Sequence, residues 1–298
     1  MCYNQKKHRK GFFNMTLLRQ QMIQDMKLKG LSEKTINSYV RYIRDFALFY
    51  DKSPEQLGSK EIKEYLMHLI EVKKRSNVYL RGCYSAMKFI YGITMGQEWE
   101  KLKIPQIKRK RRLPEVLAKE EIEKILEVTE ITKYRTMFML MYGTGLRIGE
   151  TVRLRVDDID RNRKVIRVNQ GKGLKDRYTL LPDVLMKELE KYYKRVRQNE
   201  WLFPGDKEGQ HITERSVQRA FQQSKTKAAI RKKVSVHTLR HSFASHIVEA
   251  GYDVYHLQKL MGHSTVKTTN RYIQISRASA LKVVSPLEGL LGDSPCLK

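Results

Sequence analysis

Hydrophobic and polar positions in the first third of the chain repeat with the period of an α-helix. Apolar side chains recur three or four residues apart in four stretches, which start near Met15, Ser32, Ser59 and Ser76. Serine is a residue type that caps helix N-termini, so three of these starts carry a matching cap. The pattern predicts four short amphipathic helices, packed as a small bundle over residues 15–104. The clearest apolar stripe consists of Ile36, Tyr39, Val40, Ile43, Phe46, Ala47 and Tyr50.

The pattern changes in the second half of the chain. The apolar run from Met137 to Tyr142 predicts a buried helix that ends at the glycines that follow. After it come three short extended segments separated by polar turns, which predict a small antiparallel sheet. These segments are residues 152–159, 164–169 and 177–181. Helical periodicity returns after Pro182, and a last helix is expected from about Ser264. We therefore expect a mostly α-helical protein, with an N-terminal four-helix bundle and a C-terminal mixed α+β domain over residues 117–280.

Three segments fall outside these two domains. Residues 1–14 are predicted to form a basic, poorly ordered N-terminal segment. Residues 105–116 predict a linker, because Pro105 and Pro114 restrict helix continuation and bracket a run of five cations. These are Lys108, Arg109, Lys110, Arg111 and Arg112. The run fits a solvated spacer, and it equally fits a linker that lies along phosphates. Residues 281–298 form a tail too apolar for a free end, so we expect it to dock, on its own domain or on a neighbouring subunit.

The amino-acid composition predicts that the protein binds a polyanion. The chain has 298 residues, with 59 Lys and Arg against 32 Asp and Glu, for a net charge of +27. Residues 1–112 hold 25 basic and 10 acidic side chains and the remainder 34 and 22, so the charge is not confined to one tail. Such a protein is expected to bind nucleic acid. The sequence shows no signal peptide and no span long enough for a membrane. Three scattered cysteines indicate a reducing cytoplasm rather than a disulfide framework.

Six polar residues form a candidate chemical set. Two arginines, one lysine, two histidines and one tyrosine suit phosphoryl transfer without a metal. Arginine forks bind phosphate oxygens, and a lysine on a hairpin tip can protonate a leaving alkoxide. Tyrosine can be a covalent nucleophile, although its free pKa near 10 requires a base and a cationic neighbourhood. The six are Arg147, Lys172, His237, Arg240, His263 and Tyr272.

The segments that carry these residues resemble the tyrosine recombinase (phage integrase) family, especially its short Xer-like and transposon-encoded members. The resemblance runs from about Met15 to Tyr272, and the six positions match in order and spacing. It rests on Thr-Gly-Leu-Arg-Ile-Gly-Glu, Gly-Lys-Gly-Leu-Lys-Asp-Arg, His-Thr-Leu-Arg-His-Ser-Phe-Ala and Leu-Met-Gly-His-Ser-Thr-Val-Lys-Thr-Thr-Asn-Arg-Tyr. By this resemblance the protein is a site-specific recombinase acting on double-stranded DNA, and residues 117–280 are its catalytic domain.

The resemblance also implies a role for each residue. Tyr272 would attack the scissile phosphodiester and form a 3′-phosphotyrosyl link. Arg147 and Arg240 would hold the phosphate, with Glu150 in structural support. Lys172 would protonate the leaving 5′-oxygen. His237 would act as general acid and base near the tyrosine, and His263 would support the phosphate.

The family assembles as a tetramer on two DNA sites and exchanges strands through a Holliday junction, so the resemblance implies a homo-tetramer with a tail that contacts a neighbouring subunit. No metal and no cofactor is implied. An accessory recombinase or a DNA-bending protein is a candidate further partner. The target sequence, the host and the biological event stay open.

Taken singly, the residues also have simpler explanations. Arg147 could pair with Glu150 three residues away, and Lys172 could be a solvated hairpin tip. His241 and His246 match no chemical role, so we expect both to be structural. His237 and His241 have the spacing of zinc ligands, but Thr238 follows where zinc-protease motifs have glutamate, which disfavours a metal.

Two other functions remain open from the sequence. A type IB topoisomerase would use the same cleavage chemistry without a partner site. A non-catalytic DNA-binding regulator could keep the fold, although it would not need Tyr272 and Lys172 together.

Overall fold

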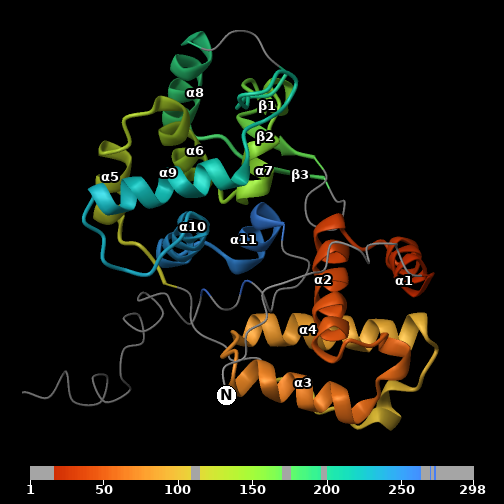
Figure 1. Ribbon diagram of the computed structural model, residues 1–298. Helices are drawn as coiled ribbons and strands as arrows, with labels where there is room; N and C mark the ends of the chain where they lie inside the picture. Colours follow the sequence, from red (N-terminus) through yellow and green to blue (C-terminus); the bar gives the residue numbers. More distant parts are fainter. Residues whose placement is uncertain are drawn as a thin grey trace, which may run out of the picture. The chain divides into compact units, whose positions relative to one another are not determined.

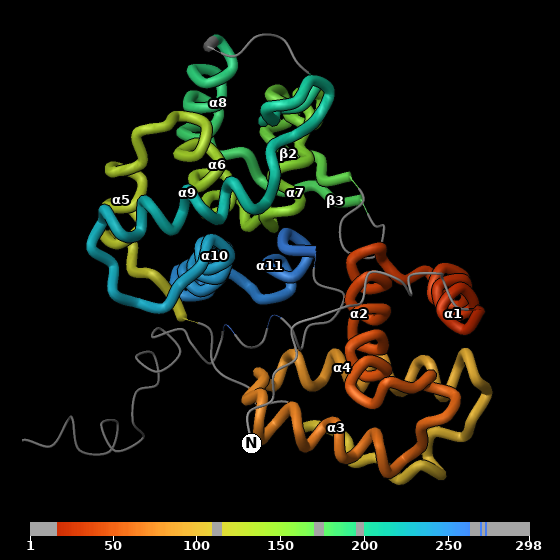
Figure 2. The backbone as a smooth tube through the Cα atoms, viewed as in Figure 1, coloured from red at the N-terminus to blue at the C-terminus, as the bar shows by residue number. Residues whose placement is uncertain are grey.

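The structure is a computed structural model that describes residues 17–108, 115–169, 176–195 and 200–262, together with residues 269 and 272. The chain divides into two compact units, residues 1–112 and residues 113–298, which are described in turn. Figure 1 shows the elements of both units, and Figure 2 traces the same backbone as a tube. Within the described residues, no helix combines the length and the apolar character needed to cross a membrane.

The first unit is the predicted four-helix bundle. Its helices are α1 (Leu17–Leu28), α2 (Glu33–Tyr50), α3 (Ser59–Glu71) and α4 (Asn77–Phe89), with short turns η1 (Pro54–Gln56), η2 (Ile90–Thr94) and η3 (Trp99–Leu102). The predicted stripes form one core, whose members include Met26, Phe46 and Ile62. Tyr91 ties η2 to the loop after α2, because its buried hydroxyl donates to the carbonyls of Pro54 at 2.8 Å and Leu57 at 2.9 Å.

Two of the three predicted serine caps are present. The side chain of Ser32 accepts a hydrogen bond from the N–H of Thr35, and Ser76 accepts one from Tyr79, each at 3.3 Å. Ser59 does not cap α3 but is its first residue. There the Glu61 carboxylate accepts from the Gly58 N–H at 2.8 Å, so an acidic side chain inside the first turn does the capping.

The second unit combines helices with one small sheet. The helices are α5 (Lys119–Glu127), α6 (Thr132–Thr144), α7 (Ile148–Val152), α8 (Asp183–Arg195), α9 (Glu214–Lys227), α10 (His237–Glu249) and α11 (Val254–Met261), with a turn η4 (Val156–Asp158). Strands β1 (Ile159–Asp160), β2 (Val165–Val168) and β3 (Arg177–Leu180) pair antiparallel in chain order, with Ile166 opposite Thr179. The expected fold class, mostly α with a small antiparallel sheet, is therefore confirmed.

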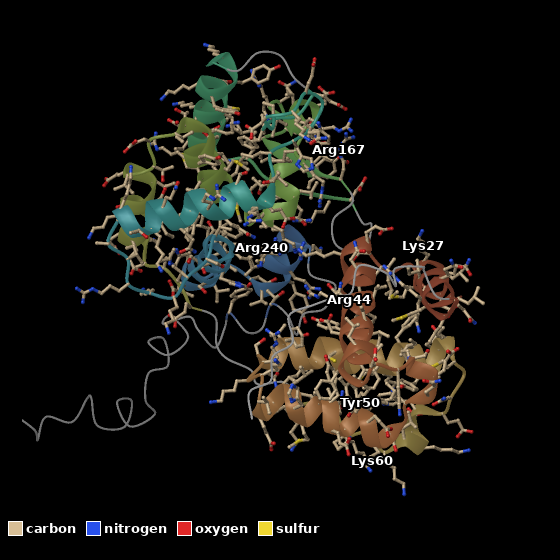
Figure 3. The ribbon with its side chains drawn as sticks, viewed as in Figure 1. Lys27, Arg44, Tyr50, Lys60, Arg167 and Arg240 are labelled. Atoms are coloured by element: carbon tan, nitrogen blue, oxygen red, sulfur yellow. The ribbon has the colours of Figure 1, made fainter. Side chains whose placement is uncertain are left out.

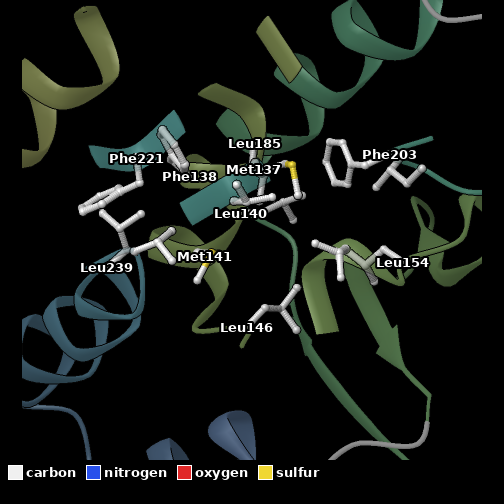
Figure 4. Packing of buried hydrophobic residues seen from close by; sticks show 14 of the residues in the cluster. Met137, Phe138, Leu140, Met141, Leu146, Leu154, Leu185, Phe203, Phe221 and Leu239 are labelled. Atoms are coloured by element: carbon white, nitrogen blue, oxygen red, sulfur yellow. The ribbon is translucent and has the colours of Figure 1, made fainter. Parts of the chain in front are cut away.

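Helix α6 supplies the centre of the second core. Figure 4 shows Met137, Phe138, Leu140 and Met141 surrounded by side chains from other elements, among them Leu185, Phe221 and Leu239. Phe138 and Phe221 meet edge to face, with ring centroids 5.5 Å apart. Because α10 packs against α6 while α11 packs against α10 and β3, this core fixes the helices that carry the candidate site residues.

The predicted strand over residues 152–159 is wrong. Residues up to Val152 belong to α7, residues 156–158 form η4, and only Ile159 and Asp160 pair with β2. The Asp158 carboxylate accepts from the Arg155 N–H at 2.9 Å and closes the turn. The other two predicted strands are present within one residue at each end. A further helix expected from about residue 264 lies outside the described residues.

Candidate active site

Arg147 and Glu150 lie in the turn between α6 and α7. Gly145 ends α6 with a φ of +68°, in the left-handed region that favours glycine. A Cβ at Gly145 would also lie 2.6 Å from the ring of Phe243. The Arg147 N–H then donates to a carboxylate oxygen of Glu150 at 2.8 Å, which closes the first turn of α7. The simple pairing expected from the sequence is present, because Arg147 Nη1 also donates to Glu150 Oε1 at 2.7 Å.

Glu150 holds more than one arginine. Arg177, at the start of β3, donates through both terminal nitrogens to the two carboxylate oxygens, at 3.0 and 2.8 Å. Arg240 Nη1 lies 3.9 Å from Glu150 Oε2. The Glu150 side chain is 4% exposed and that of Arg240 2%. Three guanidinium groups around one carboxylate leave an excess of positive charge, and this arrangement is suited to an anion.

The end of α11 binds the same three arginines. Arg177 Nε donates to the carbonyl of Leu260 at 3.0 Å, Arg240 Nη2 to that of Met261 at 2.7 Å, and Arg147 Nη2 to that of Gly262 at 3.2 Å. The last carbonyls of a helix have no partner inside the helix and lie at the negative end of its dipole. The arginines satisfy them and fix the C-terminal end of α11 beside Glu150.

Gly262 is required for this contact. Its φ is +59°, and a Cβ there would lie 2.8 Å from Cδ and 2.9 Å from Nε of Arg177. The side chain of Arg177 is held at its far end by Glu150 and Leu260, so it has little freedom to move aside.

The charges in the cluster shift the pKa values of its members. Burial alone would raise the pKa of Glu150, but the hydrogen bonds and charge of Arg177, and then those of Arg147, outweigh burial and lower the pKa to about 2. Burial, followed by the charge of Arg147, lowers the pKa of Arg240 to about 9. Glu150 is therefore anionic and Arg240 cationic at neutral pH.

We expect Glu150 to stabilise the second unit only while it is ionised. A pKa lowered from 4.5 to about 2 on folding gives stability that is full above pH 4.5 and is lost as pH falls towards 2. The free energy of unfolding should lose roughly 2 kcal/mol from this group by pH 3. In Glu150→Gln this contribution is absent, so the stability difference from the parent should shrink by that amount between pH 7 and pH 3.

Urea denaturation followed by fluorescence measures this difference. The chain has two tryptophans, so the replacement Trp99→Phe leaves Trp201 to report on the second unit alone. Glu208→Gln, at an exposed glutamate of the same unit, is the control. A difference between Glu150→Gln and its parent that stays constant from pH 7 to pH 3 would contradict the prediction.

Helix α10 brings the candidate histidine and arginine to the cluster. His237 begins the helix, and Arg240, which is labelled in Figure 3, follows one turn later. The side chain of Arg240 is buried. The guanidinium of Arg240 also donates to the carbonyl of Gly145. Burial, and next to it the charges of Arg240 and Arg147, lower the pKa of His237, so its imidazole is neutral at pH 7.

Tyr272 lies in the same unit and is 2% exposed. Its ring packs with Phe243, Leu257 and Met261 from α10 and α11. Its hydroxyl lies 2.9 Å from Nδ1 of His241. The charge of Tyr272 is one of the influences on the pKa of Arg240, so the hydroxyl lies within electrostatic reach of that guanidinium.

The structure thus brings together Arg147, Glu150, Arg240, His237 and Tyr272 in one unit. Lys172, His263, residues 109–112 and the tail over residues 281–298 lie outside the described residues. Lys108 is described and exposed, and its carbonyl accepts from Asn77 Nδ2 at 3.0 Å. Among the described residues, no group of three or more His, Cys, Asp or Glu side chains could hold a metal ion.

Sequence reasoning missed Arg177 and the contact of His241. Arg177 is the last residue of the motif Gly-Lys-Gly-Leu-Lys-Asp-Arg, and an arginine opening a half-buried strand is a usable signal for a buried ion pair. The other histidine that matches no chemical role, His246, has its Nδ1 2.9 Å from the hydroxyl of Tyr142.

Family models match both halves of the chain. Residues 115–278 match the phage integrase family, and residues 18–101 match the phage integrase N-terminal SAM-like domain. A putative integrase/recombinase of Sinorhizobium fredii is 36% identical over 282 residues, which cover 94% of this chain and 92% of that protein. The tyrosine recombinase XerA of Thermococcus kodakarensis is 32% identical over 277 residues, which cover 90% of this chain and 95% of that protein.

Solved structures agree with these matches. A crystal structure of XerA recombinase is 27% identical with a TM-score of 0.52, and the match covers 89% of this chain and 95% of that one. XerH recombinase bound to a palindromic difH substrate, in a post-cleavage complex, is 20% identical with a TM-score of 0.69, and the match covers 91% of this chain and 85% of that one. The XerH similarity concerns the fold.

Proposed function

Because the chain belongs to the phage integrase family and is a site-specific DNA recombinase, we propose that it cleaves and rejoins DNA through a covalent bond between Tyr272 and a 3′-phosphate. One observation carries the proposal. The hydroxyl of Tyr272 belongs to the same unit as three arginines that share a single carboxylate and lies within electrostatic reach of one of them, Arg240, which supports a nucleophile acting beside an anion site.

The chemistry follows from these groups. Arg147 and Arg240 bind the non-bridging oxygens of the scissile phosphate and offset the charge that develops on them. Tyr272 Oη forms a bond to phosphorus while the bond from phosphorus to the 5′-oxygen breaks. Lys172 protonates the leaving 5′-oxygen, His237 serves as general acid and base, and His263 supports the phosphate. The ester retains the energy of the broken bond, so a 5′-hydroxyl from another strand can reverse the step.

Glu150 and Arg177 hold the binding groups in place. Glu150 fixes the guanidinium of Arg147, and Arg177 occupies both oxygens of Glu150. The positive charge comes from side chains, so we propose that cleavage needs no metal and no cofactor.

Assembly and partners are proposed on the same basis. We infer a homo-tetramer on two copies of a specific double-stranded DNA site, with strand exchange through a Holliday junction. XerH, with the same fold, has been captured on a difH DNA substrate, which supports DNA as the partner. Residues 108–112 would contact phosphates and residues 281–298 a neighbouring subunit, with an accessory recombinase or a DNA-bending protein as a further partner. We propose the cytoplasm as its compartment.

The test is the trapping of a covalent intermediate in the absence of metal ions. A binding site is first selected from random duplexes with the wild-type protein. The selected duplex is then nicked near the cleavage point, so that the released fragment diffuses away and the adduct accumulates. We expect a protein attached to a 3′-phosphate on a denaturing gel, at the same rate in EDTA as in magnesium.

A requirement for magnesium in the cleavage step, or attachment to a 5′-phosphate, would contradict the proposed chemistry. A second assay with two selected sites on one plasmid separates recombination from topoisomerase activity. Exchange between the sites supports the recombinase, whereas relaxation of supercoils without exchange would favour the type IB alternative.

A further inference from the structure

The hydroxyl of Tyr272 has a hydrogen-bond partner that the proposed function does not use. His241 Nδ1 lies 2.9 Å from Tyr272 Oη, and the two ring centroids are 5.9 Å apart. Tyr272 is 2% exposed, so this contact is shielded from water. A hydrogen bond in such surroundings is electrostatically stronger than one at the surface.

The position of His241 on α10 explains why it reaches the nucleophile. His237 and His241 are four residues apart, so they lie on neighbouring turns of one helix face. Their rings meet edge to face, with centroids 5.0 Å apart. Arg240 projects from the same helix into the arginine cluster. Helix α10 therefore presents a histidine to the hydroxyl and a cation to the anion site.

The two histidines differ in their surroundings and contacts. Burial and the charges of Arg240 and Arg147 lower the pKa of His237, which makes its imidazole a weaker base. His241 has the geometry of a direct acceptor. A neutral imidazole with its hydrogen on Nε2 accepts at Nδ1 from the tyrosine hydroxyl.

We propose that His241 is a catalytic residue that holds the Tyr272 hydroxyl and takes its proton as the oxygen attacks phosphorus, so that His241 rather than His237 is the base for the nucleophile. This inference rests on the proposed function, in which Tyr272 is the nucleophile. In the step, the Tyr272 O–H bond breaks and its proton moves to Nδ1 of His241. The bond from Tyr272 Oη to phosphorus forms as the bond from phosphorus to the 5′-oxygen breaks. The leaving oxygen takes a separate proton from its own acid, Lys172.

The chain provides a matched control for this pair. His246, five residues further along α10, also places its Nδ1 2.9 Å from a tyrosine hydroxyl, that of Tyr142. Neither His246 nor Tyr142 belongs to the proposed catalytic machinery. Equal replacements at the two histidines therefore remove the same interaction from the same helix, and only one of them removes it from the nucleophile.

The experiment measures single-turnover adduct formation by the full-length protein on the nicked duplex at saturating DNA. His241→Ala removes the acceptor. His241→Asn keeps an acceptor oxygen near the place of Nδ1, but an amide does not take up a proton at neutral pH. We expect both variants to be slower by about 10²-fold, the lower end of the range for general acid–base catalysis. His246→Asn should form adduct at about the wild-type rate, and all three should bind DNA with unchanged affinity.

A second substrate shows whether the defect concerns the proton lost by Tyr272 or the proton gained by the leaving 5′-oxygen. A duplex with sulfur in place of the bridging 5′-oxygen needs no acid for its leaving group, so it should leave the His241 defect in place. The inference is overturned if His241→Ala cleaves at or above the wild-type rate, because the hydrogen bond then only holds Tyr272 in a resting position and does not assist its attack. It is also overturned if His241→Asn is as fast as wild type, if sulfur removes the defect, or if His246→Asn loses as much activity. An adduct formed by a protein with Tyr272→Phe would refute the proposed function itself, whatever the histidine variants do.

Discussion

Replacing Tyr272 by phenylalanine is expected to reduce the covalent protein–DNA adduct to background while leaving DNA affinity unchanged. The substitution removes the oxygen that would bond to phosphorus and nothing else. The phenyl ring keeps its packing against Phe243, Leu257 and Met261. Loss of the hydrogen bond to His241 should lower the free energy of unfolding by about 1 kcal/mol. Binding and folding therefore remain as controls on the loss of chemistry.

The measurement uses the nicked duplex on a denaturing gel beside a DNA-binding assay. Tyr142→Phe is the matched control, because it removes a tyrosine hydroxyl that bonds another histidine of α10. We expect this control to form adduct as the wild type does. An adduct in Tyr272→Phe that maps to the same phosphate would remove Tyr272 from the mechanism.

The second large effect is expected at Lys172. Lys172→Ala should slow cleavage of ordinary DNA by about 10²- to 10⁴-fold, because an alkoxide leaves poorly without a proton. With sulfur at the bridging 5′ position, the variant should cleave at close to the wild-type rate, since a thiolate leaves without one. Single-turnover cleavage rates of the wild type and the variant on each substrate measure both the loss on ordinary DNA and the rescue by sulfur.

Lys175 provides the control in the same motif. Lys175→Ala changes the charge of the segment equally, so any effect of lost charge on DNA binding appears in both variants. The assignment of the acid to Lys172 fails if wild type cuts both substrates and sulfur does not rescue Lys172→Ala.

Much of the fold could be predicted because its signals are local. Helical stripes and serine caps depend on residues within one or two turns, and the predicted helices that fall on described residues are present. The failed strand over residues 152–159 has a non-local cause. Arg155 is extended, but it and Leu154 pair with residues 201 and 202 rather than with β2. The pairing consists of a bridge from Arg155 to Trp201 and a hydrogen bond from the Leu202 N–H to the Leu154 carbonyl.

The same distinction holds for the candidate site. The pairing of Arg147 with Glu150 spans three residues and could be predicted from helix geometry. Arg177 reaches Glu150 across 27 residues, and His241 reaches Tyr272 across 31. Contacts between residues so far apart along the chain cannot be predicted from the residue spacing of a single sequence. Family motifs located the individual residues, while the second partner of Glu150 and the contact of the nucleophile required the folded chain.

The close approach of Gly262 to Arg177 limits how this sequence can evolve. An alanine at position 262 would require a left-handed backbone that L-residues disfavour, and it would displace the Arg177 side chain from beside it. A shorter residue at position 177 would leave space for a Cβ at position 262, but Glu150 would lose its bidentate ion pair with Arg177. The two positions are therefore expected to covary among homologues, with glycine retained wherever the arginine is retained and larger residues tolerated only after the arginine has been replaced.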